Sequence, residues 1–301
     1  MGWKGFVEGW IASVVAGVST HPLDLIKVRM QLQGEQGKMQ ESYMNPFVMG
    51  AKLVRAEGFA GLYAGVSAAM LRQTLYASTR LGIYDMLKHR LSGDSGSGGG
   101  VVGGADLPLF QKVAAALIAG GIGAAAGNPA DVVMVRMQAD GRLPAKERRS
   151  YRNAFDALSQ MVRNEGILSL WRGSSLTVQR AMIVTAVQLA SYDHVKETLA
   201  FYKITNEGIA THLVASLTSG FLTSVVSEPI DVIKTRVMNM KVVFGKTPPY
   251  RNAIDCAMKT IRSEGVLALY KGLLPCFARQ GPFAVVLFIT LEQTKEMLKD
   301  F

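Results

Sequence analysis

Three arginines share one spacing from a carboxylate further along the chain. Each stands thirteen residues before it: Arg72 before Asp85, Arg180 before Asp193, and Arg279 before Glu292. Thirteen residues of α-helix cover ~20 Å, so in membrane-spanning helices each arginine would lie deep in the membrane. Cations at that depth are functional by default, and the planar guanidinium can hold a carboxylate through two parallel hydrogen bonds. Residue type and spacing therefore predict a site for small carboxylate anions.

A second set of charges follows three prolines, in the pattern Pro-x-Asp-x-x-Lys/Met-x-Arg that begins at Pro22, Pro129 and Pro229. Side chains three and seven residues apart share one face of a helix. The residues on that face are Asp24, Lys27 and Gln31 in the first copy, Asp131 and Gln138 in the second, and Asp231 and Lys234 in the third. Under threefold pseudosymmetry these faces would meet, and carboxylates of one helix would pair with lysines of the next to close one end of a cavity.

This ring of charges is incomplete, because Met134 and Met238 interrupt the pattern. If the lysine of the first copy pairs with the third copy, Asp24 is left without its lysine.

A third recurring pattern combines an acidic residue with a lysine three positions later. Its copies are Tyr84-Asp85-x-x-Lys88, Tyr192-Asp193-x-x-Lys196 and Leu291-Glu292-x-x-Lys295. One such pair would be an ordinary surface pair, but three copies at matching positions predict a second gate at the opposite end of the cavity.

The elements that position these residues form a threefold repeat of about 100 residues. Each proline motif is followed by Glu-Gly and then by an aromatic residue, one further residue and Gly: Glu57-Gly58 and Tyr63 to Gly65, Glu165-Gly166 and Trp171 to Gly173, Glu264-Gly265 and Tyr270 to Gly272. We expect repeats over residues 1–91, 106–203 and 207–301, with a flexible Gly- and Ser-rich connection at 92–105.

Each repeat predicts a long helix, a short helix and a second long helix. The long helices are expected at 5–33, 67–90, 111–139, 174–200, 209–240 and 274–299, and the short ones at 46–57, 151–164 and 252–263. The long ones are long enough to cross a bilayer, and small residues four apart, as at Gly9, Ser13 and Gly17, suit close packing of membrane helices. Charge at membrane depth is costly unless it faces water. The prediction is an all-α membrane protein with six spanning helices around a water-filled cavity, and a soluble helical repeat protein is the alternative.

The composition of the 301 residues narrows the class of function. The chain is 49% apolar, 19% charged and has a net charge of +10, which suits anionic lipid or anionic substrates. The bases recur at repeat-related positions rather than in one patch, so nucleic acid is not expected as a partner. Two cysteines without metal-ligand spacing predict no metal site, and no cleavable targeting sequence, cofactor motif or catalytic motif is found.

The three motifs together resemble the mitochondrial carrier family, across almost the whole chain. Met134 and Ala64 depart from the family pattern, which has basic residues there. The resemblance implies a matrix gate at the proline motifs, braced by Gln31 and Gln138, and a cytoplasmic gate at the acidic–lysine pairs. It also implies substrate contacts and cardiolipin-binding helix ends. The contacts are Arg72, Gln73, Arg180, Ala181 and Arg279, and the lipid-binding residues are Gly65, Arg172, Gly173, Lys271 and Gly272.

Within the family, the runs from Thr20 to Asp24 and from Ala139 to Pro144 are most similar to dicarboxylate carriers and their oxoglutarate-carrier and uncoupling-protein neighbours. The resemblance implies a monomeric carrier of the mitochondrial inner membrane. It would exchange dicarboxylates such as malate, succinate or oxaloacetate with each other, or with phosphate or sulfate, by alternating access. A regulated proton leak and an oxoglutarate/malate exchange are the alternatives.

Overall fold

The computed structural model describes residues 3–35, 45–91, 109–143, 148–201, 209–241 and 248–297. Six long helices run through these residues: α1 (Trp3–Gln31), α3 (Val66–Leu91), α4 (Leu109–Asp140), α6 (Ser174–Phe201), α7 (Ile209–Asn239) and α9 (Leu273–Met297). One short helix lies between the two long helices of each repeat: α2 (Pro46–Gly61), α5 (Ala154–Glu165) and α8 (Ala253–Glu264). The predicted order of long, short and long helices is confirmed.

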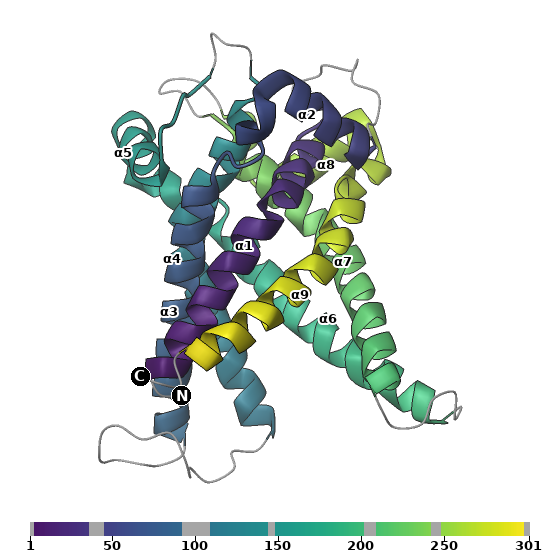
Figure 1. The fold of residues 1–301 in the computed structure, drawn as a ribbon. Coiled ribbons are helices and arrows are strands. Elements are labelled where there is room, and N and C mark those ends of the chain that lie inside the picture. The colour runs from purple at the N-terminus through teal and green to yellow at the C-terminus, as the bar shows by residue number, and fades with distance from the viewer. Residues whose placement is uncertain are drawn as a thin grey trace.

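The repeats close into a ring because the second long helix of each repeat packs against the first long helix of the next repeat. α3 packs on α4, α6 packs on α7, and α9 returns to α1. The short helices gather at one end of the bundle, called here the matrix end, whereas both termini lie at the other (Figure 1). At the terminal end, the ends of α6 and α7 stand well apart from those of α1 and α3 (Figure 1).

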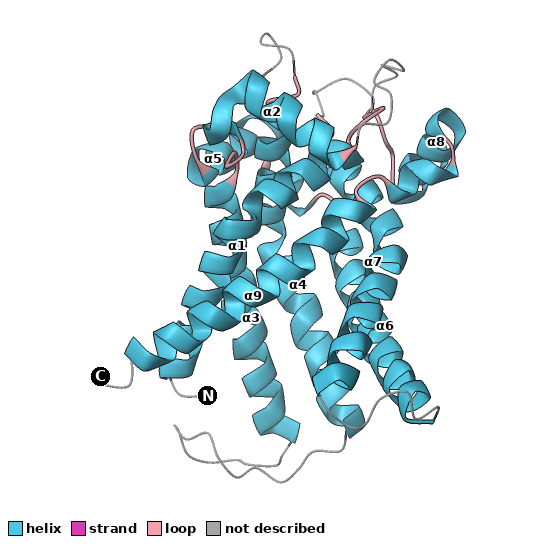
Figure 2. Cartoon of the chain, turned by 45° about the vertical axis from the view of Figure 1, so that its right-hand side comes forward, coloured by secondary structure: helices cyan, strands magenta, loops and turns pink. Residues whose placement is uncertain are grey.

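Proline lies inside α1, α4 and α7, at Pro22, Pro129 and Pro229. A proline inside a helix removes one hydrogen bond and bends the axis. Figure 2 shows the long helices inclined toward one another beneath the short helices. The kinked helices thus bring the three proline motifs together at the matrix end.

The short helices have defined ends. Asn153 and Asn252 accept hydrogen bonds at the N-termini of α5 and α8, and Gly166 and Gly265 end these helices at φ values of 82° and 84°. A 3-10 helix follows each, η1 (Ile167–Trp171) and η2 (Val266–Tyr270). In the first repeat the expected helix end at Gly58 is confirmed, because Gly58 is non-helical at φ 71° and ψ 178°. A further helical turn follows this break and extends α2 to Gly61.

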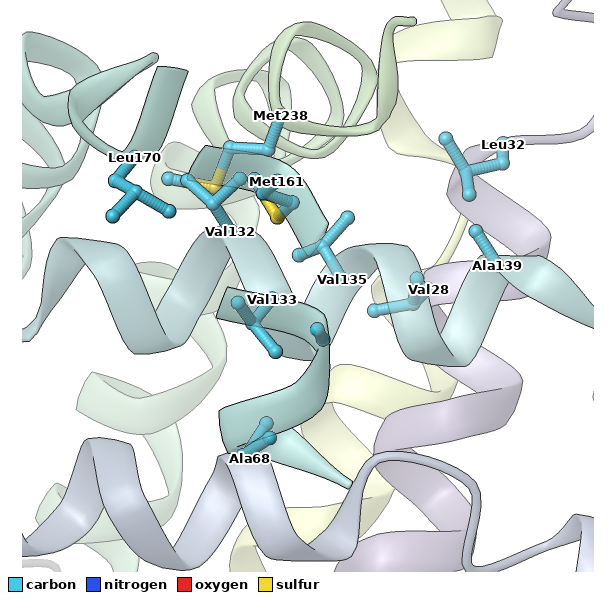
Figure 3. Close-up of a cluster of buried hydrophobic side chains, with 12 residues drawn as sticks. Val28, Leu32, Ala68, Val132, Val133, Val135, Ala139, Met161, Leu170 and Met238 are labelled. Atoms are coloured by element: carbon cyan, nitrogen blue, oxygen red, sulfur yellow. The ribbon is translucent and has the colours of Figure 1, made fainter. Parts of the chain in front are cut away.

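The largest buried apolar cluster surrounds α4 at the matrix end. Val132, Val133 and Val135 of α4 lie among Val28 of α1, Ala68 of α3, Met161 of α5 and Met238 of α7, as Figure 3 shows. Apolar burial stabilises this end by about 25 cal/mol per Å² removed from solvent. The cluster therefore joins helices of all three repeats beside the gate residues.

The outer faces of the long helices carry exposed apolar side chains, including Ile118, Leu217, Phe221 and Phe288. Three stretches in the described residues are long and apolar enough to cross a membrane: Val7–Gln31, Ile118–Asp140 and Val266–Met297. α3, α6 and α7 reach 26 to 31 residues, or ~39 Å and more at 1.5 Å per residue. Their length also suffices for spanning.

Candidate functional site: a charged cavity between the repeats

A cavity of about 240 Å³ lies between the three proline motifs. All six long helices contribute to its lining: Asp24, Lys27 and Gln31 from α1, Arg72 and Gln73 from α3, Asp131, Met134 and Gln138 from α4, Arg180 from α6, Asp231 and Lys234 from α7, and Arg279 from α9. A second cavity of about 670 Å³ shares Arg72, Asp131, Arg180 and Lys234 with the first and adds Ala181 and Tyr192. The residues predicted for the substrate site and the matrix gate thus lie side by side.

Each of the three arginines forms an ion pair with the aspartate of the next repeat. Arg72 Nε lies 3.5 Å from Asp131 Oδ1. Arg180 pairs with Asp231, and Arg279 pairs with Asp24. The sequence did not reveal these contacts, because each joins two repeats and two separate motifs. They place the three arginines against the aspartates of the proline motifs, which were predicted to form the matrix gate.

Two lysines complete the matrix gate. Lys27 Nζ lies 2.5 Å from Asp231 Oδ2, and Lys234 Nζ lies 2.7 Å from Asp131 Oδ2. Asp131 and Asp231 therefore each hold a lysine on one oxygen and an arginine on the other. Their side chains are 8% exposed, so the paired cations offset the cost of burying each carboxylate.

The third aspartate differs. The first lysine pairs with the third repeat, as anticipated, and Met134 lines the cavity where a base would otherwise stand. Within the described residues Asp24 has no lysine partner, as expected, and it pairs with Arg279 instead. Asp24 is also the most accessible of the three, with a side chain 22% exposed. Asp24 forms an ion pair with an arginine, whereas each of the other two aspartates pairs with an arginine and a lysine.

The two glutamines of the proline motifs have different surroundings. Gln31 Nε2 donates to Glu228 at 2.7 Å, and Gln31 Oε1 accepts from Thr235 at 2.7 Å. Gln138 is buried, and its amide atoms have no hydrogen-bond partner in the described part of the chain. Gln31 therefore links α1 to α7, whereas the contacts of Gln138 are those of packing.

The residues expected at the cytoplasmic gate are separated. Asp193, Lys196, Glu292 and Lys295 are exposed, and no ion pair joins them within the described residues. Tyr192 is half-buried and lines the larger cavity. Tyr84, Asp85 and Lys88 lie on α3, but their side chains fall outside the described part. In the described part of the chain, ion pairs close the end at the proline motifs, whereas the terminal end is open because the ends of α6 and α7 stand apart from those of α1 and α3 (Figure 1).

A second ring of ion pairs was missed in the sequence. It links the last arginine of each proline motif to the glutamate of the following Glu-Gly pair: Arg29 to Glu57, Arg136 to Glu165 and Arg236 to Glu264. Each shortest contact is 2.5 Å, and each pair is bidentate. A signal was present, because the partners recur 28 or 29 residues apart.

The same arginines also reach across the repeats. Arg29 Nε donates to the Gln138 carbonyl at 3.1 Å, Arg136 Nε to that of Met238 at 3.1 Å, and Arg236 Nε to that of Gln31 at 3.2 Å. All three arginines are at most 4% exposed. Each guanidinium thus fixes a short helix and the end of the neighbouring proline-kinked helix at once.

The basic residues expected at lipid sites join this ring. Arg172 Nη1 lies 2.9 Å from Glu165 Oε2, and Lys271 Nζ lies 2.6 Å from Glu264 Oε2. Burial opposes the charge of these glutamates, but the hydrogen bonds and charges of Arg136 and Arg172 hold the pKa of Glu165 below its usual value. Arg236 and Lys271 do the same for the pKa of Glu264.

The glycines expected to bind lipid are points of close approach between repeats. Gly65, Gly173 and Gly272 have φ values of 86°, 77° and 107°, in the left-handed region that favours glycine. A Cβ would lie 3.3 Å from Gln138 Cγ at Gly65 and 3.3 Å from Met238 Cγ at Gly173. At Gly272 it would lie 2.8 Å from Glu228 Oε1.

Comparisons with known proteins agree with this architecture. A family model described as mitochondrial carrier protein matches residues 2–95, 105–203 and 205–301. The chain is 54% identical to mitochondrial uncoupling protein 5 of Arabidopsis thaliana, over all of this chain and 99% of the relative. It is 52% identical to mitochondrial uncoupling protein 4 of the same plant, over the whole of both chains.

A further relative carries a different name. The chain is 44% identical to the human mitochondrial 2-oxoglutarate/malate carrier protein, over 98% of this chain and 90% of the relative. Repeats, helices and relatives agree: the chain belongs to the mitochondrial carrier family and is a multi-pass transporter of the mitochondrial inner membrane, not an enzyme.

Proposed function

We propose that this carrier exchanges small dicarboxylates, such as malate, succinate or oxaloacetate, with each other or with phosphate or sulfate. The observation that carries the proposal is the ring of Arg72, Arg180 and Arg279, each already paired with a carboxylate. A site that holds three aspartate carboxylates on guanidiniums has the chemistry to hold those of a substrate. Gln73 lines the smaller cavity and Ala181 the larger one, and both would contribute to the shape of the site.

The size of the cavity suits a small anion. Pockets for drug-sized ligands measure about 300–1,000 Å³, whereas the cavity between the gate residues is about 240 Å³. Three arginines around a dianion leave one positive charge over, so a divalent anion is favoured over a neutral solute. The surplus also suits a second small anion such as phosphate or sulfate as counter-substrate.

The ion pairs suggest how binding would loosen the matrix gate. A dianion entering from the open end meets guanidiniums that are 33–37% exposed. If its carboxylates replace those of the aspartates, the gate loses three of its five contacts and keeps two, Lys27 to Asp231 and Lys234 to Asp131. Opening of this end and closure of the cytoplasmic gate, at Asp85, Asp193 and Glu292 with their lysines, would complete alternating access.

We propose two further properties on weaker grounds. Helix N-termini attract phosphate, so the starts of α3, α6 and α9, at Gly65, Gly173 and Gly272, would hold cardiolipin headgroups at the membrane surface. Arg172 and Lys271 would assist while keeping their glutamate contacts. A single chain surrounds the whole cavity, so the monomer would be the transporting unit.

The names of the relatives define the alternatives. An uncoupling protein would conduct protons, and a 2-oxoglutarate/malate carrier would favour the five-carbon substrate. Purified protein in liposomes, loaded with malate, separates these cases. Rapid uptake of labelled malate, succinate or phosphate supports the proposal. A fatty-acid-activated proton current without exchange would replace it by a leak, and inhibition by oxoglutarate but not by phosphate would favour oxoglutarate/malate exchange.

A further inference from the structure

The residues that precede the three kink prolines are His21, Asn128 and Glu228, and each side chain is wholly buried. His21 Nε2 lies 3.0 Å from the Ala64 carbonyl. Asn128 donates to the Leu170 carbonyl at 2.8 Å and accepts from Thr177 at 2.9 Å. Only Glu228, among these three, brings an ionisable acid to this position. Glu228 contacts Gln31 and Lys27 of the first proline motif, but it was not expected in the gate or the substrate site.

Glu228 lies beside an aspartate and shares its lysine. Glu228 Oε1 accepts a hydrogen bond from Gln31 at 2.7 Å. Glu228 Oε2 has no hydrogen bond from the described residues and lies 3.4 Å from Lys27 Nζ, which is itself 2.5 Å from Asp231 Oδ2. A carboxylate oxygen of each acid and Cys276 Sγ all lie within 4.8 Å of one another. One ammonium group therefore faces two carboxylates.

The charges around Glu228 balance only while Arg180 takes part. Asp231 and Glu228 on α7 face Lys27 of α1 and Arg180 of α6. From α9 only the uncharged Cys276 thiol reaches the group, accepting from Lys27 Nζ at 3.1 Å. Lys234, the lysine of the third proline motif, forms its ion pair with Asp131 at 2.7 Å. If a dianion takes Arg180, Lys27 alone remains between two acids.

The excess negative charge falls on a buried carboxylate. Like charges close together disfavour ionisation of both acids, and burial disfavours it further. Asp231 lines the cavity, and so does Asp24, whose side chain is 22% exposed; water can solvate both. Glu228 lies outside that lining and is 0% exposed.

We propose that Glu228 is a proton-binding site that takes up one proton when a dianion occupies the arginines, so that substrate and proton move together. The proton comes from water in the open cavity and forms an O–H bond on the Glu228 carboxylate, with no other bond broken. Lys27 lines the cavity and contacts Glu228. It therefore lies on the path of the proton from the cavity to Glu228. The proposal rests on the proposed function, because it requires substrate to bind Arg180.

The test is the pH dependence of substrate affinity in liposome exchange, between pH 6.5 and 8, with malate and with sulfate. Sulfate stays a dianion throughout, so it removes titration of the substrate itself. Uptake of one proton on binding makes the KM rise with pH, by up to tenfold per pH unit. The Glu228→Gln variant keeps the shape and hydrogen bonding of a protonated acid, and its KM should not change with pH. Glu35→Gln, which neutralises a carboxylate outside the gate, should keep the wild-type slope.

A direct measurement covers the case in which the Glu228→Gln variant does not fold. Malate added to purified wild-type protein in weak buffer should consume about one proton per bound anion. A wild-type KM independent of pH, binding without proton uptake, or a folded Glu228→Gln carrier that keeps the wild-type slope would each overturn the proposal. Absence of any dicarboxylate exchange by the wild type would instead overturn the proposed function.

Discussion

At the scale of single residues, Asp24 is the gate aspartate that lacks a lysine. Asp131 and Asp231 each hold a lysine and an arginine, whereas Asp24 holds Arg279, and Met134 lies in the same cavity. The matrix gate therefore has one contact fewer than threefold symmetry would give. If substrate competes with the aspartates for the arginines, as proposed, Asp24 is the aspartate that it would leave with no cation.

Restoring the missing base tests this asymmetry. Met134→Lys should add an ion pair with Asp24, worth between about 0 and a few kcal/mol because desolvation opposes the attraction. We expect a higher unfolding temperature in detergent and slower malate exchange in liposomes, since the closed matrix gate becomes harder to open. Met134→Leu is the uncharged control and should change neither. An unchanged Met134→Lys carrier would show that residue 134 does not reach Asp24.

At the scale of elements, three arginine–glutamate pairs fasten the short helices to the kinked helices. Arg236 is 1% exposed and bonds Glu264, Thr260 and two carbonyls of the first repeat. Because the guanidinium cannot reach water, loss of its carboxylate leaves a buried charge without its counter-ion.

Glu264→Gln should therefore be strongly destabilising. Removing one partner of a buried pair costs about 3–5 kcal/mol. The matched control lies on the same helix: Lys259 pairs with Asp255 at 2.8 Å, but its side chain is 52% exposed, and such surface pairs contribute about 0–1 kcal/mol. Thermal unfolding in detergent should separate the two variants clearly. Similar losses for Glu264→Gln and Lys259→Gln would contradict the buried link.

Two glycines at helix ends allow the cost of backbone strain to be separated from the cost of a steric clash. Gly166 and Gly272 both have positive φ, at 82° and 107°. A Cβ at Gly166 meets nothing within 4 Å, whereas one at Gly272 meets Glu228 and Gln31. Gly166 combines its positive φ with a ψ of 164°, so Gly166→Ala should cost only backbone strain, about 1–3 kcal/mol. Gly272→Ala should cost clearly more in thermal unfolding. Equal losses would mean that α9 does not approach the gate as closely as described.

The elements show what the sequence could and could not predict. Helical lengths and the recurring prolines predicted α1, α4 and α7 with their gate residues. The ion pairs between Arg72 and Asp131 and their equivalents were missed, since they join different repeats and no local spacing encodes them. Glu228 was also missed, although comparison of the residues before the three prolines would have singled it out. The break at Gly58 was predicted, but the helical turn that follows it, to Gly61, was not.

At the scale of the whole molecule, hydrogen bonds on the matrix side of the gate join the three repeats. Asn239 of the third repeat donates to Glu35 of the first at 3.0 Å, and Arg149 of the second donates to the Asn239 carbonyl at 2.8 Å. Burial raises the pKa of Glu35 above 4.5, against the opposing hydrogen bond from Asn239 and the charges of nearby arginines.

The sign of this shift predicts how stability changes with pH. A carboxylate with a raised pKa in the folded state binds protons more tightly when folded, so its contribution to stability falls as pH rises through the folded pKa. Glu35→Gln should therefore raise the unfolding temperature at pH 7.5, and the gain should vanish near pH 4. Asp193→Asn, an exposed residue, is the control. A Glu35→Gln variant less stable than the wild type at pH 7.5 would contradict this account.

The central claim is that three arginines, one from each repeat, hold the substrate together. Arg180→Ala should nearly abolish malate/malate exchange in liposomes, and Arg180→Lys should also fail because an ammonium group lacks the bidentate fork. The fold should survive, since Asp231 keeps Lys27, and thermal unfolding checks this. Lys196→Ala should change the rate of exchange but not the substrate preference. The account predicts a folded, inactive Arg180→Ala carrier; a folded Arg180→Ala carrier with wild-type malate uptake and affinity would contradict it.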